Sequence, residues 1–194
     1  KLSAAVLRPT GYQLWPPARS ALRPDRTKPA ILKIRMSLDV PAVQAALRAS
    51  RLDGWLLYDF HGSNPVSRRV AGLATTGHMT TRRWFYLVPA QGEPRALVHK
   101  IEKRTLAHLP GHTFEYAGRV ELEAGLRQLL VGCGTVAMEY SPRAAIPYVS
   151  RVDAGTIELV RDCGAAVVSS GDPVQQFEAS WPEDALATHR AASD

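Results

Sequence analysis

Apolar and polar positions follow two different spacings along the chain from Met36 onward. Short apolar runs are typical of buried strands, and apolar residues three and four positions apart are typical of helices with one buried face. Expected strands cover residues 55–60, 83–88, 95–99, 113–116, 135–138 and 165–169. Expected helices begin near Ser37 or Asp39, cover 101–109, 120–131, 144–152 and 153–161, and start again at Pro173 and Trp181.

The alternation of strands and helices predicts an α/β fold with helices on both faces of one sheet. A proline- and glycine-containing turn at 89–94 joins the second and third strands, so this pair is expected to be antiparallel and the sheet mixed. We expect three parts along the chain: a leader at 1–35, the α/β domain at 36–172, and a linker helix with the truncated start of a further domain at 173–194. The expected core residues are Trp55, Leu57, Phe85, Leu87, Leu97 and Val167.

Positive charge is concentrated in the leader. The 194 residues carry a net charge of +6, but residues 1–35 alone hold eight basic side chains and one acidic side chain, Asp25. Five prolines interrupt this segment, and it lacks the sustained apolar stretch of a secretory signal. We expect a disordered basic leader. A second interpretation is upstream sequence that precedes a natural start at Met36.

The remaining composition argues against nucleic acid and membrane partners. A nucleic-acid surface needs a folded basic platform or aromatic stacking groups, which the leader does not offer. No apolar run approaches the roughly 20 residues that a membrane helix needs. The two cysteines, Cys133 and Cys163, have no metal or redox spacing. Reduced structural thiols of this kind are typical of a cytoplasmic protein.

Polar side chains follow the first and third expected strands, where open α/β sheets usually bind their ligands. Arginine binds carboxylates through paired hydrogen bonds, so a carboxylate substrate is one candidate ligand. Glu139, which ends another strand, could instead pair with one of the arginines. The alternative interpretation is ordinary strand-end polarity and solvated loop charge. The substrate-binding candidates are His61, Asn64, Arg68, Arg69 and His99.

No catalytic motif is present in the sequence. The six histidines are scattered, and we find no HExxH, no GxSxG and no nucleotide-binding glycine loop. A hydrolytic metal site needs several histidines or carboxylates that converge on one ion. We therefore expect neither catalytic residues nor metal ligands within this chain.

Four passages occur in a specific order after the first expected helix. They are 52–57 (LDGWLL), Ser63-Asn64 with Ala71-Gly72-Leu73, Val136-Ala137-Met138-Glu139, and 165–172 (AAVVSSGD) with Pro182-Glu183. In this order they resemble the amino-terminal domain of the creatinase, Xaa-Pro aminopeptidase and prolidase family of metallopeptidases. Arg69 departs from the pattern, since the family often has an aromatic residue there.

The resemblance implies a ribonuclease-H-like α/β domain that caps the active site of a cytoplasmic, homodimeric hydrolase and takes part in its dimer contacts. It implies two divalent metal ions and a peptide or small amide substrate, both bound by a carboxyl-terminal domain outside this sequence. The expected parent is an Xaa-Pro aminopeptidase-like enzyme, and this chain alone is expected to be inactive. Two alternatives remain: a stand-alone α/β binding or dimerisation module, and a nucleic-acid protein that uses the basic leader.

Overall fold

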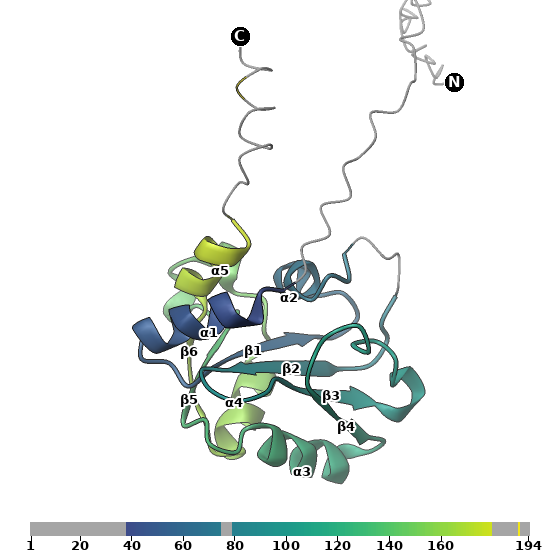
Figure 1. Cartoon of the computed structure of the whole chain (residues 1–194). Helices are drawn as coiled ribbons and strands as arrows, with labels where there is room; N and C mark the ends of the chain where they lie inside the picture. Colours follow the sequence, from purple (N-terminus) through teal and green to yellow (C-terminus); the bar gives the residue numbers. More distant parts are fainter. Residues whose placement is uncertain (1–37, 75–78, 180–189, 191–194) are drawn as a thin grey trace, which may run out of the picture. The chain divides into compact units, whose positions relative to one another are not determined.

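The computed structural model describes residues 38–74, 79–179 and 190, which form a mixed sheet covered by helices (Figure 1). The strands are β1 Gly54–Asp59, β2 Trp84–Pro89, β3 Arg95–His99, β4 His112–Tyr116, β5 Thr135–Met138 and β6 Ala166–Ser169. The helices are α1 Val40–Ala49, α2 Pro65–Val70, α3 Arg119–Leu129, α4 Ala154–Asp162 and α5 Gly171–Phe177. Three short 3-10 helices are η1 Lys100–Glu102, η2 Pro142–Ala144 and η3 Pro147–Val149.

The strand order of the sheet is β4-β3-β2-β1-β5-β6. β2 runs antiparallel to both of its neighbours, with Leu56 of β1 opposite Leu87, whereas the β3–β4, β1–β5 and β5–β6 pairs are parallel. The predicted α/β class, the mixed sheet and the antiparallel 83–99 hairpin are therefore confirmed. As a result, the carboxyl ends of every strand except β2 lie along one edge of the sheet.

Both faces of the sheet carry a buried apolar cluster. Helices α1, α2 and α5 cover one face, and α3 and α4 cover the other (Figure 1). Along β1, Trp55 and Leu57 face the first cluster while Leu56 and Tyr58 face the second, as the two-residue period of a strand requires. All six predicted core residues are buried.

Three helices begin at side chains that cap them. Asp39 accepts a hydrogen bond from the amide of Ala42, 3.0 Å away, which confirms the predicted start of α1. Asp153 caps α4 in the same way, and Asn64 caps α2. α2 is not among the expected helices. Its signal is the pair Asn64-Pro65, a capping residue followed by a proline at the first helical position.

Two of the expected helices are wrong. Residues 101–109 form the end of η1 and a series of turns. Among the large apolar side chains of this segment, only that of Leu106 is fully buried, and Ile101 is 73% exposed. The segment therefore has no continuous apolar face that would hold a helix against the sheet. Residues 144–152 contain the last residue of η2 and the whole of η3 instead of one helix. Pro147 disfavours helical backbone at the preceding residue, and Ile146 accordingly has φ −126° and ψ 89°.

Several predictions fall outside the described residues. These are the basic leader at 1–35 and the helix expected from Trp181, so the predicted domain boundaries remain predictions. Within the described part, Cys133 and Cys163 form no disulfide. No helix there is long and apolar enough to cross a membrane.

Candidate functional site

The candidate site lies at the carboxyl ends of β1 and β5. After β1 the chain turns toward β2 on one side of this place in the sheet, and after β5 it turns toward β6 on the other side. Ligands of open α/β sheets bind outside such a reversal point. Here a closed cluster of polar side chains lies on the α2 and α5 face, and an open pocket lies on the α3 and α4 face.

Glu139 is the centre of the closed cluster, which we call the Glu139 hub. Its side chain is fully buried and accepts four hydrogen bonds. Trp55 Nε1 (2.8 Å) and Ser170 Oγ (3.1 Å) donate to one carboxylate oxygen. Asn64 Nδ2 (2.8 Å) and Ser67 Oγ (2.6 Å) donate to the other. These hydrogen bonds connect β1, α2, β5 and the start of α5, so the hub holds together four segments that are distant in the sequence.

All partners of Glu139 are neutral, so its predicted pairing with an arginine is wrong. Arg68, one of the candidates, forms an ion pair with Asp59 instead, with 3.3 Å between Nη1 and Oδ2. Burial raises the pKa of Glu139, and the hydrogen bonds from Ser67, Trp55, Asn64 and Ser170 only partly oppose this effect.

The raised pKa predicts a specific pH dependence of stability. The folded state holds the proton of Glu139 more tightly than the unfolded chain, whose ordinary value is 4.5. This group's contribution to the free energy of unfolding is therefore greatest below about pH 4.5 and falls as the pH rises through the raised pKa. Glu139→Gln cannot titrate, so urea unfolding should show a smaller decline between about pH 4 and 8 than in the wild type. If the free energy of unfolding of the two proteins changed in parallel with pH, the raised pKa of Glu139 would be contradicted.

A second buried carboxylate, Asp59, shapes the loop that follows β1. It accepts hydrogen bonds from the amides of Gly62 (3.2 Å) and Asn64 (2.9 Å) and from Thr80 Oγ1 (3.2 Å). Its ion pair with Arg68 adds a contact from α2. Together these contacts fix the loop at the edge of the sheet and connect it to the start of the following segment at Thr80.

The five predicted substrate-binding residues do not line one common cavity. His61 is exposed at the tip of the loop, and the ring of Phe60 lies 5.1 Å from its own. The side chain of Asn64 is used inside the Glu139 hub. Arg68 contacts Asp59, as described above. These three residues are close in the chain and lie at the same edge, and their role in substrate binding stays a prediction.

Arg69 and His99 contact different parts of the fold. Arg69 forms an ion pair with Glu178, just after α5, and lines a groove of about 440 Å³ between α2, α5 and η3. His99 accepts a hydrogen bond from the amide of Ile101, and its Nε2 lies 3.1 Å from the carbonyl oxygen of Ala117. β2 separates β3 from β1, so His99 and His61 follow strands that are not neighbours.

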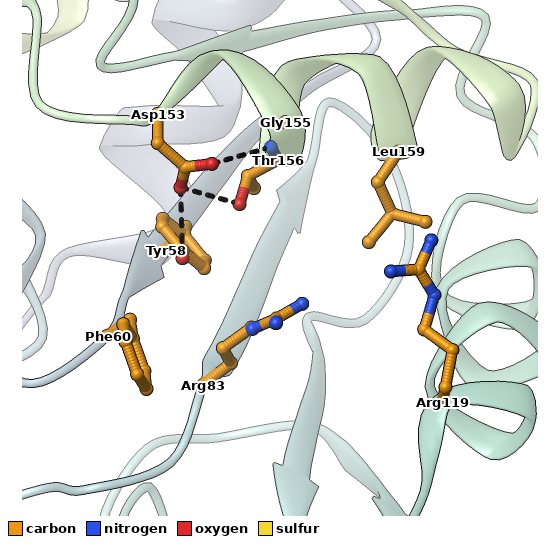
Figure 2. Close-up of a pocket in the computed structure, with 8 residues that line it drawn as sticks. All are labelled: Tyr58, Phe60, Arg83, Arg119, Asp153, Gly155, Thr156 and Leu159. Atoms are coloured by element: carbon orange, nitrogen blue, oxygen red, sulfur yellow. Dashed lines mark hydrogen bonds between the residues drawn. The ribbon is translucent and has the colours of Figure 1, made fainter.

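The open pocket on the other face has a volume of about 330 Å³ (Figure 2). Its walls come from the end of β1, the residue before β2, the start of α3 and the first turns of α4. None of its lining residues is among the predicted substrate-binding residues. The pocket is lined by Tyr58, Phe60, Arg83, Arg119, Asp153, Gly155, Thr156 and Leu159.

Asp153 organises one wall of this pocket. Its carboxylate accepts hydrogen bonds from the amide of Thr156 (2.9 Å), from Thr156 Oγ1 (2.7 Å) and from the hydroxyl of Tyr58 (3.3 Å). Burial opposes ionisation of Asp153, but these hydrogen bonds outweigh it and lower its pKa. Burial also raises the pKa of Tyr58, so at neutral pH its hydroxyl stays protonated and donates to Asp153.

Comparisons with solved structures find this fold in dipeptidases. A proline dipeptidase from Streptococcus pneumoniae matches with a TM-score of 0.54 and 15% identity, over 75% of this chain and 100% of that one. A prolidase from Pyrococcus horikoshii matches with a TM-score of 0.51 and 12% identity, over 76% of this chain and 37% of that one. A Creatine_N superfamily domain of a dipeptidase from Streptococcus thermophilus matches at 0.50 and 11%, over 72% and 97%. No family model and no curated protein matches the sequence.

These matches agree with the order of motifs in the sequence and with the mixed sheet. This chain spans little more than a third of the prolidase, 37% of its length. At identities of 11–15% the likeness establishes a fold and no activity. The chain has the fold of the creatinase-type amino-terminal domain found in these dipeptidases.

Proposed function

We propose that this chain is the non-catalytic amino-terminal cap and dimer-contact domain of a cytoplasmic, metal-dependent peptidase with Xaa-Pro aminopeptidase-like activity. The observation that carries the proposal is the match of the described sheet and helices to the Creatine_N superfamily domain of the Streptococcus thermophilus dipeptidase, together with the coverage of only 37% of the Pyrococcus horikoshii prolidase. The order of the four sequence motifs supports the same assignment independently. A stand-alone binding module is the competing hypothesis, and the reading frame beyond Asp194 separates the two, as the Discussion describes.

The described part of the chain does not fit a pair of catalytic metal ions. No group of three or more histidine, cysteine, aspartate or glutamate side chains among these residues could hold a metal ion. Metal-dependent hydrolysis needs such a group, because the bound ion lowers the pKa of the attacking water. We therefore assign the two divalent ions, and the bond cleavage, to a carboxyl-terminal domain of the parent protein.

The role we propose for this domain is to orient the substrate. His61 and Arg69 are exposed, and His99 and Arg68 are half-buried at the same edge of the sheet. These side chains would face the catalytic cleft of the same or a partner subunit and hold a peptide or small amide substrate. Asn64 would support them from within, since it caps α2 and belongs to the Glu139 hub. Orientation of this kind raises the rate without any bond being broken by the cap itself.

The first test uses the purified chain alone. It should release no amino-terminal residue from Xaa-Pro peptides, with or without added Mn²⁺, Co²⁺ or Zn²⁺, and should bind none of these ions stoichiometrically. Mass spectrometry of the peptides measures hydrolysis. Isothermal titration calorimetry with each metal measures binding. Metal-dependent cleavage that copurifies with the chain would contradict the non-catalytic role.

The second test applies to the parent enzyme. Arg69→Ala should lower kcat/KM for peptide substrates about tenfold, because a charge-assisted contact to the substrate is lost. The melting temperature should change little, since half-exposed ion pairs such as Arg69–Glu178 contribute little to stability.

Arg127→Ala on α3 is the matched control, because Arg127 also pairs with a glutamate, Glu123, but lies on the opposite face of the sheet. It should leave both kinetic constants unchanged. Unchanged kinetics in Arg69→Ala, with the protein folded, would leave Arg69 as a solvated loop charge.

A further inference from the structure

Arg83 is a half-buried cation without an ion-pair partner in the described part of the chain. Its guanidinium group lies over the ring of Phe60, 6.0 Å from the ring centre. Within residues 38–74 and 79–179 its side chain forms no ion pair and no hydrogen bond, whereas its backbone carbonyl accepts a hydrogen bond from the hydroxyl of Tyr116 at 2.8 Å. The backbone is thus anchored while the donor groups of the guanidinium remain available.

A second arginine reaches the same pocket from α3. Figure 2 shows the side chains of Arg83 and Arg119 pointing into the space below the first turns of α4 from opposite sides. Nε of Arg119 donates to Glu123 at 2.6 Å, which orients the side chain, and Glu123 is not among the residues that line the pocket. Glu123 therefore positions the guanidinium of Arg119 from outside the cavity, whereas the guanidinium of Arg83 lies over Phe60, a lining residue.

The charges of the lining residues do not balance. Two arginines face one carboxylate, Asp153, which already accepts three hydrogen bonds from Tyr58 and Thr156. Glu123 compensates Arg119 from outside the cavity, so the charge that a bound anion would neutralise is chiefly that of Arg83. Phe60 and Leu159 add an apolar part to the wall, and a volume of about 330 Å³ is within the range of small-molecule sites.

We propose that this pocket binds the oxyanion group of a small molecule, a carboxylate or a phosphate, between Arg83 and Arg119. Guanidinium groups bind both anions through paired hydrogen bonds. Phe60 and Leu159 would contact the apolar part of the ligand. All of these residues belong to this chain, so the site does not depend on the proposed peptidase function and can be tested without any further domain.

The test is a titration of the full chain with sodium phosphate and, separately, with sodium succinate, at constant ionic strength, followed by NMR or calorimetry. Saturable binding of at least one anion is expected. Arg83→Gln and Arg119→Gln should each weaken it about tenfold, and Arg83→Lys should weaken it less because the charge remains. The matched control is Arg82→Gln, the exposed neighbour whose side chain donates to the carbonyl of Thr81 and does not line the pocket.

Each outcome decides the proposal. Binding of succinate alone identifies a carboxylate site and binding of phosphate alone identifies a phosphate site, and both support it. If neither anion binds saturably, the proposal is overturned. It is also overturned if Arg82→Gln weakens anion binding as much as Arg83→Gln does, because this would indicate a general effect of surface charge. The melting temperature of each variant controls for folding. If Arg83→Gln does not fold, Arg119→Gln still decides, because the side chain of Arg119 is 67% exposed.

Discussion

Glu139→Ala should lower the free energy of unfolding by about 3–5 kcal/mol, measured by urea unfolding. The substitution removes the acceptor of four buried donors, and Trp55 Nε1 and Ser170 Oγ have no other partner within the described part of the chain. A buried donor without a partner costs about 1–3 kcal/mol, and the cavity left by the truncated side chain adds to this cost. Because the hub connects β1, α2, β5 and α5, we expect the loss to be global and cooperative.

The matched control is Glu158→Ala on α4, which removes the same carboxylate from an exposed position. It should change the free energy of unfolding by less than about 0.5 kcal/mol, as surface substitutions usually do. A similarly small effect of Glu139→Ala would show that the hub does not hold the four segments together.

Leu57→Ala should cost about 2–5 kcal/mol, the usual range for truncating a buried leucine. Leu57 is fully buried in the centre of β1, opposite Tyr86 of β2, and belongs to the apolar cluster under α1 and α2. Neighbouring strands on both sides leave little room for the surrounding side chains to fill the cavity.

Val120→Ala serves as the control, because Val120 is an aliphatic residue on α3 with 82% exposure. Its effect on unfolding should stay within about 0.5 kcal/mol. A cost below about 0.5 kcal/mol for Leu57→Ala would mean that the register of β1 places a different residue in the core.

Most of the fold could be predicted from the sequence because each strand is a short apolar run between turn residues. The runs that contain Trp55 and Phe85 are buried on both faces, so their hydrophobic signal is strong and their ends are marked by glycine, proline or charge. α2 was missed because six residues are too few for a helical period to be visible. The expected helix at 144–152 is wrong because Pro147 disfavours helical backbone at Ile146.

The candidate site was harder to predict, for a topological reason. Glu139 was noticed as a polar residue at a strand end, but its partners Trp55 and Ser170 are 84 and 31 residues away in the chain. Only the strand order brings them together. The open pocket likewise combines Phe60, Arg83 and Asp153 from three separate segments. Short sequence motifs do not reveal such combinations of distant residues, although they were sufficient to indicate the family resemblance.

The most direct test of the central claim is the sequence of the reading frame beyond Asp194 in the source DNA. The proposed cap of a metallopeptidase predicts that the frame continues into a second domain that contains two aspartates, a histidine and two glutamates in that order, the ligands of the two metal ions that the resemblance implies. A stop codon close to Asp194 in the natural gene, or a continuation without these ligands, would contradict the proposed function and favour a stand-alone α/β module.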